Sequence, residues 1–260
     1  MAGRPPHSPA DAPYEVIAAV RDNAAWCDLM CRAHGRPGTF AERAWTNPAR
    51  TPLYYPDAVT LSPLATAADV LPHIDAGSGA SVKDSFATLD LPGFEVLFEA
   101  QWIHRAAPEP AETSWQVVED AATLAAWAAA CGLPDLFPPA LLTPAATDAA
   151  TDAATGAETS SGTGSGTGSG TGAATGSGTT TTIVYGRTGG AITEGAVLTS
   201  TGDVVGVSNV FGPASAWAGV TAMAARLFPG RPLVGYESDP SDALAHGFTT
   251  TGPLRILLKP

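Results

Sequence analysis

The segment from Ile183 to Leu258 alternates strand-like and helix-like stretches, and this order limits the folds that the chain can adopt. Short apolar runs bounded by turn residues predict strands, and apolar residues at helical spacing predict helices. In chain order the predicted elements are strands over Ile183–Gly186, Ala196–Ser200 and Val204–Phe211, a helix over Ala216–Phe228, a strand over Leu233–Tyr236, a short helix or turn over Asp239–His246 and a strand over Leu254–Leu258. This alternation indicates an α/β fold, a twisted mixed sheet flanked by helices.

A low-complexity stretch from Ala145 to Thr182 interrupts this pattern. It consists almost wholly of Thr, Gly, Ser and Ala and contains no large apolar residue. Ordering a backbone costs roughly 1–2 kcal/mol per residue, and nothing in this stretch can be buried to offset that cost. We therefore expect a disordered insertion over 145–182, inside a main domain of residues 113–260. The Pro-rich residues 1–13 are also expected to be flexible.

Residues 14–112 are predicted to form an additional α+β region. Tyr14–His34 is a predicted helix with one apolar stripe, and Phe94–Arg105 alternates as a strand with one mainly apolar face. A strand over Trp115–Val118 and a helix that Asp120 would cap begin the main domain. One interpretation of the first region is a degenerate half that packs on the main domain.

The composition excludes some classes of partner. The chain has 25 acidic and 13 basic residues, for a net charge of −12, and such a surface repels a phosphate backbone. We therefore expect no nucleic-acid partner. No apolar stretch is long enough to span a bilayer, so no membrane partner is expected. Three cysteines form a sparse, odd set, which favours a reducing cytoplasm.

Several segments resemble the GNAT acetyltransferase superfamily. SWQVVEDAATLAAWAAACG looks like that family's first strand and helix, and GAVLTSTGDVVGVSNVF looks like its third and fourth strands. PLVGYE looks like the fifth strand, and HGFTTTGPLRILL, with Gly247-Phe248, looks like the closing part. The similarity covers a little over half of the chain. An abundance of Ala, Gly, Pro and Arg suggests a divergent actinobacterial branch.

The resemblance implies a site for acetyl-CoA. In this family the fourth and fifth strands separate, the pantetheine arm pairs with their free edges like an added strand, and the pyrophosphate lies on the amino end of the next helix. The positions that would bind the cofactor are Val207, Ser208, Asn209, Val210, Phe211, Gly212, Ala214, Ser215, Ala216 and Trp217.

The phosphate loop departs from the family pattern. Ala214 stands where the family has Arg or Gln, and Trp217 stands where it has Gly. Pro213 removes one backbone N–H. Only Gly219 agrees with the pattern. Acetyl-CoA is therefore expected to bind weakly or not at all.

Two titratable residues follow the predicted fifth strand. Tyr236 and Glu237 could act as general acid and general base in the acylation of an amine. The alternative is that Tyr236 is an aromatic at the edge of the core and Glu237 a solvated charge. Ser208 and Asn209 are unusual in a buried strand, and they could either line the cleft or form a bulge.

Cys27, Cys31 and His34 lie on one face of the first predicted helix. Thiolates and an imidazole can bind zinc, but the two cysteines continue the apolar stripe of Val16 and Val20. We expect these residues to pack in the core, and we expect no metal site.

Two functions remain open at this stage. The first is acyl transfer from acyl-CoA to a small amine. The second is a non-catalytic binding or regulatory module that keeps the fold without the cofactor. The sequence leaves the oligomeric state open.

Overall fold

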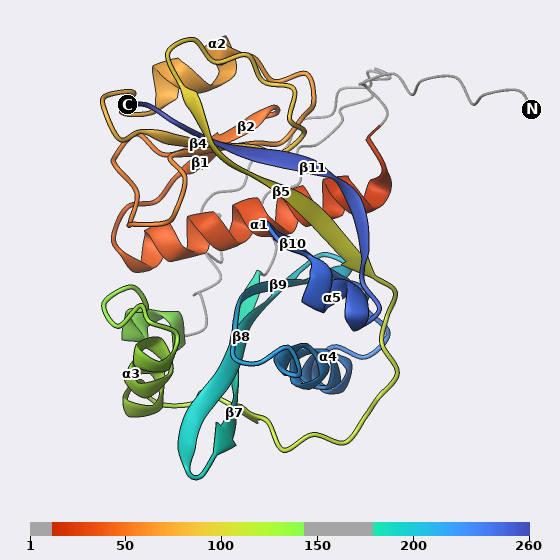
Figure 1. Ribbon diagram of the computed structural model, residues 1–260. Helices are drawn as coiled ribbons and strands as arrows, with labels where there is room; N and C mark the ends of the chain where they lie inside the picture. Colours follow the sequence, from red (N-terminus) through yellow and green to blue (C-terminus); the bar gives the residue numbers. More distant parts are fainter. Residues whose placement is uncertain (1–11, 143–178) are drawn as a thin grey trace, which may run out of the picture.

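The computed structural model describes residues 12–142 and 179–260 as one mixed α/β unit (Figure 1). The strands are β1 Thr39–Phe40, β2 Ala44–Thr46, β3 Ala58–Thr60, β4 Ser81–Asp84, β5 Glu95–Arg105, β6 Gln116–Val117, β7 Thr180–Thr188, β8 Ala191–Thr201, β9 Val204–Phe211, β10 Leu233–Glu237 and β11 Thr249–Leu258. The helices are α1 Tyr14–Ala33, α2 Ala67–Val70, α3 Ala121–Ala130, α4 Ala216–Leu227 and α5 Ser241–Ala245, with 3-10 turns η1 Leu71–His73 and η2 Pro139–Leu142. The predicted fold class, a twisted mixed sheet flanked by helices, is confirmed.

All of these strands belong to a single sheet of eleven strands in the order β1-β2-β3-β4-β11-β5-β10-β9-β8-β7-β6. β5 comes from residues before Thr113 and lies between β10 and β11, with which it pairs antiparallel. The predicted amino-terminal region and the predicted main domain therefore share one sheet.

The two ends of the sheet have the same connectivity. β2 and β3 pair antiparallel, and β3 and β4 pair parallel across a connection that contains α2. β8 and β9 likewise pair antiparallel, and β9 and β10 pair parallel across α4. The strand that follows each of these two sets pairs with the other set. β5 follows β4 in the chain but lies beside β10, and β11 follows β10 but lies beside β4.

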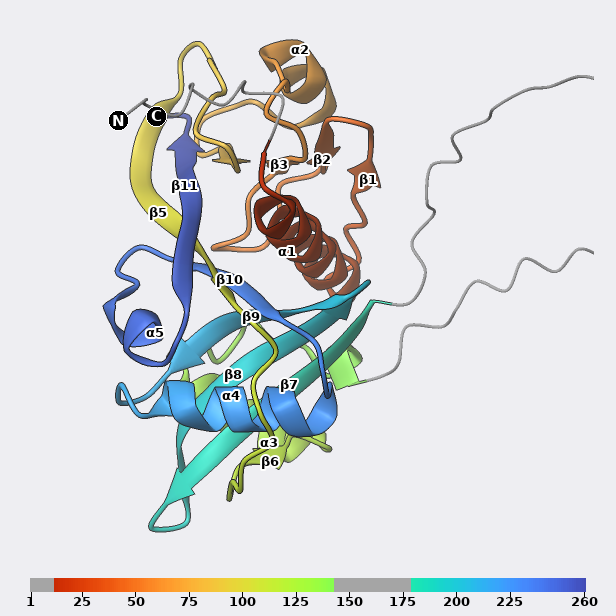
Figure 2. The ribbon, with the colours of Figure 1, turned by 90° about the vertical axis from the view of Figure 1, so that its right-hand side faces the viewer.

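The helices cover both faces of the sheet (Figure 2). α1 crosses one face over β8, β9 and β10, and α4 covers the other face of β8 and β9. The predicted stripe of α1 is buried, including Val20, Cys27 and Cys31 at no more than 1% exposure. Asp120 caps α3 as predicted and accepts a hydrogen bond from the N–H of Thr123 at 2.8 Å.

Three tryptophans anchor the core, and each indole N–H has a partner. Trp45 donates to Asp28 Oδ1 at 3.0 Å, Trp102 to the carbonyl of Ser85 at 2.7 Å, and Trp127 to the carbonyl of Val184 at 3.0 Å. All three side chains are fully buried. A buried indole needs such a partner, so these bonds fix where each ring lies.

The predicted insertion was drawn too long at its carboxyl end. Thr180, Thr181 and Thr182 belong to β7, where they pair with Ser200, Thr199 and Leu198. Threonine is β-branched and suits a strand, which the low-complexity composition concealed. Residues 145–178 of the predicted insertion lie outside the described residues, as do residues 1–11. The disorder expected of both segments therefore stays a prediction.

Within the described ranges, no helix has the length and apolar character needed to cross a membrane.

Candidate functional site

The parallel pair β9 and β10 separates soon after it begins. Only Leu233 and Val234 of β10 pair with β9, opposite Val205 and Gly206. From Gly235 to Glu237, β10 pairs with β5 alone, while β9 continues to Phe211 beside β8. The parallel ladder between β9 and β10 therefore consists of two residue pairs. Beyond these pairs the two strands are separated by a gap without strand pairing.

A β-bulge in β9 coincides with this separation. The register against β8 shifts between the pairs Val197–Ser208 and Gly195–Phe211. Asn209 lies there with a φ of 52°, a left-handed conformation that Asn tolerates better than most residues. The bulge, one of the two interpretations of Ser208 and Asn209, is present, and Ser208 also lines the cavity described below. A bulge bends its strand, which accounts for the direction that β9 takes away from β10.

The amino end of α4 follows β9 through the exposed loop Gly212–Ser215. Three of its N–H groups already donate to turn carbonyls: Ala216 to Pro213 at 2.8 Å, Trp217 to Ala214 at 3.3 Å and Ala218 to Ser215 at 3.0 Å. The Ser215 side chain forms no capping hydrogen bond. Three of the groups that could bind an anion at this helix start are therefore engaged within the chain.

The motif predicted that Trp217 would lie in the phosphate-binding loop. The structure instead places its side chain in the core. Its side chain is 5% exposed and packs edge-on against Phe248 in the core beneath α4, with ring centroids 5.1 Å apart. Its position in the first turn of an amphipathic helix directs the indole to the sheet. Trp217 is therefore a core residue.

Gly219, the one position that agrees with the phosphate motif, also has a packing role. A Cβ added there would lie 2.1 Å from the indole of Trp115. Gly212 likewise packs on β8, where an added Cβ would lie 2.6 Å from Cβ of Glu194. Both glycines are therefore required by close contacts within the fold.

Tyr236 and Glu237 point to opposite faces of β10, because side chains alternate along a strand. Tyr236 lies on the α1 face, where its ring packs edge-on against Trp102 at 5.6 Å. Glu237 lies on the other face, and burial, together with the nearby carboxylates of Asp239 and Asp242, raises its pKa to about 7. A carboxylate with this pKa is suited to accept a proton near neutral pH.

Sequence analysis missed a group of polar residues on the α1 face of the gap. Asp22 is 4% exposed, its Oδ1 has no hydrogen-bond partner, and burial raises its pKa well above the usual value. Its other oxygen lies over Gly206, 1.6 Å from where a Cβ would be. Lys83 on β4, 2% exposed, donates to Asn23 Oδ1 at 2.6 Å and lies 4.1 Å from the centre of the Tyr236 ring.

These residues enclose a cavity of about 10 Å³ at the point where β9 and β10 part. Asp22 and Asn23 of α1 line it together with Ser208 and Gly235, and the Ser208 hydroxyl is also buried without a partner. A cavity of this size holds about one water molecule. The sequence could have pointed to Asp22, because its carboxylate lies at helical spacing from Ala19 and Trp26. All three residues are buried in the structure.

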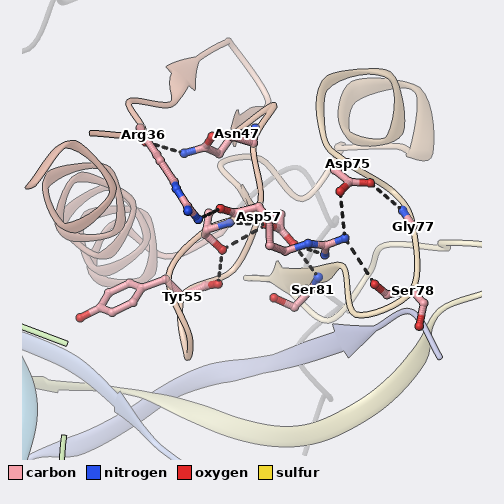
Figure 3. Close-up of polar contacts among 11 residues, drawn as sticks. Arg36, Asn47, Tyr55, Asp57, Asp75, Gly77, Ser78 and Ser81 are labelled. Carbon is pink, nitrogen blue, oxygen red and sulfur yellow. Dashed lines mark hydrogen bonds and ion pairs between the residues drawn. The ribbon is translucent and has the colours of Figure 1, made fainter. Parts of the chain in front are cut away.

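A second polar cluster surrounds Asp57, whose two carboxylate oxygens both accept hydrogen bonds (Figure 3). Asp57 is 1% exposed and accepts from the N–H groups of Thr51 and Ser81 at 3.0 and 2.9 Å. The Arg50 guanidinium donates to it at 3.0 Å and also contacts Asp75 at 3.3 Å. These contacts tie the loop after β2 to the start of β4, which is a structural role.

A larger hollow, of about 420 Å³, lies away from the gap. It is lined by Arg36, Leu53, Tyr54, Leu133, Asp135 and their neighbours and shares no residue with the cavity beside Asp22.

Cys27 and Cys31 lie in the core, as predicted. The ring of His34 contacts the carbonyl of Leu136 at 2.9 Å. Over residues 12–142 and 179–260, no group of three or more His, Cys, Asp or Glu side chains is arranged to hold a metal ion.

The acetyl-CoA expected from the resemblance fits only part of this site. The separated edges of β9 and β10 offer backbone groups to a pantetheine arm, which carries amides. The pyrophosphate position does not fit, because three of its N–H groups are engaged, Pro213 has no N–H, and the run from Val207 to Val220 contains no charged side chain.

Comparisons with known proteins show the fold. No protein-family model matches the chain, and no curated protein matches it by sequence. A GCN5-related N-acetyltransferase from Kribbella flavida superposes with a TM-score of 0.51 at 16% identity, over 93% of this chain and 95% of that one. An acetyltransferase-type structure of the GNAT family from Novosphingobium aromaticivorans gives 0.50 at 13% identity, over 93% and 99%. At these identities the likeness concerns the fold alone.

Proposed function

We propose that this protein, which has a GNAT-like fold, transfers an acyl group from a thioester to a small amine. The observation that carries the proposal is the gap between β9 and β10, where the parallel ladder ends after two pairs. An extended donor arm with amide groups can bind along such edges in the manner of an added strand.

Glu237 is the residue to which we assign the proton-accepting role. Acyl transfer to an amine requires that the ammonium lose a proton before or during attack, and the pKa of about 7 leaves much of Glu237 ionised at neutral pH. Tyr236 lies on the opposite face, packed against Trp102 and Lys83, and we assign it as the candidate donor of a proton to the leaving sulphur.

The test is amine-dependent release of thiol by the purified full chain. Acetyl-CoA and S-acetylpantetheine serve as donors, and a polyamine, an amino acid and an aminosugar serve as acceptors. We expect thiol release that requires the amine and that falls by roughly 10²–10⁴-fold in Glu237→Gln, the range for loss of a general base. Asp203→Asn, in the exposed β8–β9 turn, is the matched control and should keep full activity.

If no donor gives amine-dependent release, the acyltransferase proposal fails, and the fold would serve for binding without catalysis.

A further inference from the structure

We infer that the site recognises its donor through the pantetheine arm and accepts a thioester without the nucleotide as readily as an acyl-CoA. This inference rests on the proposed function. It goes further because it names the part of the donor that is recognised.

The loop before α4 has lost what a pyrophosphate needs. The N–H groups of Ala216, Trp217 and Ala218 donate to carbonyls of the preceding turn, and Pro213 has no N–H. Binding a phosphate there would require these hydrogen bonds to break. Little binding free energy would be gained, because one set of hydrogen bonds would replace another.

The electrostatics of the same loop also disfavour an anion. Gly212, Pro213, Ala214 and Ser215 are exposed and neutral, so the loop offers a phosphate no cationic side chain. The chain as a whole carries a net charge of −12. Phosphates at this position would therefore meet repulsion, and no charge-assisted hydrogen bonds would compensate for it.

The strand edges at the gap have a different character, because the groups that they present to an arm are neutral backbone N–H and C=O groups. Backbone N–H and C=O groups beyond the last β9–β10 pair can match the two amides of a pantetheine arm, and this match does not depend on side-chain identity. The recognition that remains is therefore for a neutral, amide-containing thioester.

The same arm could be free or attached to a carrier protein. The acidic surface of this chain favours the small free thioester, since a carrier protein that is itself acidic would be repelled.

The experiment compares kcat/KM for four donors with the full-length protein: acetyl-CoA, S-acetylpantetheine, S-acetyl-N-acetylcysteamine and an acetylated acyl carrier protein. We expect acetyl-CoA and S-acetylpantetheine to agree within about threefold, which is under 1 kcal/mol of differential recognition. The cysteamine thioester lacks one amide of the arm and should be at least about tenfold poorer. Adenosine 3′,5′-bisphosphate should not inhibit.

A matched pair of variants provides a second measurement. Ala214→Arg adds a cation at the exposed loop and should raise kcat/KM for acetyl-CoA but not for S-acetylpantetheine, whereas Ala214→Met, which adds a side chain of similar length without charge or an N–H donor, should change neither.

An advantage of acetyl-CoA over S-acetylpantetheine of about 100-fold or more would overturn the inference while leaving the acyltransferase function intact. A preference of similar size for the carrier protein would overturn the assignment to a free thioester. No turnover with any donor would instead remove the proposed function, and this inference with it.

Discussion

Glu237 gives the most direct prediction at the scale of single residues. Only its ionised form can accept a proton, and its pKa is raised to about 7. The kcat/KM for acyl transfer should therefore rise with pH and level off above an apparent pKa near 7. A pH–rate profile checks this, and Glu237→Gln should lose the titration along with the activity. A profile that is flat through neutral pH would exclude Glu237 as the base.

Asp22 gives a prediction about stability. Burial raises its folded-state pKa well above the usual 3.8, so the folded protein binds a proton that the unfolded chain releases. Stability from this group is present below the unfolded pKa and declines as pH rises toward the folded pKa. Asp22→Asn removes the ionisation and keeps the shape, so it should raise the unfolding free energy near neutral pH by about 1–3 kcal/mol.

The control for Asp22 is the same comparison at about pH 4, where most of the gain should vanish because the aspartate is protonated in the folded protein. Urea unfolding at both pH values measures the difference. Equal gains at both would show that ionisation of Asp22 does not limit stability.

Sequence reasoning proposed roles for Tyr236 and Glu237, which stay predictions, but it could not find what surrounds them. Neighbours in a strand alternate between faces, and the partners of Tyr236 come from Trp102, Lys83 and α1, which are remote in the chain. Asp22 resembled an ordinary charged helix residue, since its burial depends on the close approach of Gly206. Contacts of this kind are fixed by tertiary packing and leave little trace in a single sequence.

At the scale of elements, α4 is held on the sheet by Trp217. Its indole fills the core against Phe248, and the helix approaches Trp115 closely at Gly219. Trp217→Gly should therefore destabilise the protein by about 3–5 kcal/mol, the cost of truncating a large buried side chain. The exposed Ala218→Gly should cost only about 1 kcal/mol, from helix propensity alone. Thermal or urea unfolding of both variants decides whether Trp217 belongs to the core or to an open loop.

Most elements could be predicted because they carry strong local patterns. α1, β9, α4 and β10 lie close to their predicted limits. β8 is longer than predicted and begins at Ala191, since its first residues, Ala-Ile-Thr-Glu, have no strong pattern and depend on pairing with β7. The bulge at Asn209 was one of two alternatives, and the register of β8 against β9 was needed to locate it.

At the scale of the whole molecule, the fold class was predictable from the order of elements, whereas the sharing of one sheet was not. β5 reaches across to β10, and β11 reaches across to β4, so each series of strands is completed by the other. We infer that residues 14–112 are a degenerate half. Its crossover helix α2 has four residues where α4 has twelve. Pairings so distant along the chain cannot be read from local periodicity.

The central claim is that the separated edges of β9 and β10 bind the donor arm. Amide hydrogen exchange tests it most directly, on the full chain with and without pantetheine or coenzyme A at saturating concentration. The account predicts slower exchange in peptides covering Val207–Phe211 and Gly235–Glu237 with either ligand, and little change at the start of α4. Unchanged exchange along β9 and β10, or protection confined to Gly212–Ala218 and seen only with coenzyme A, would contradict it.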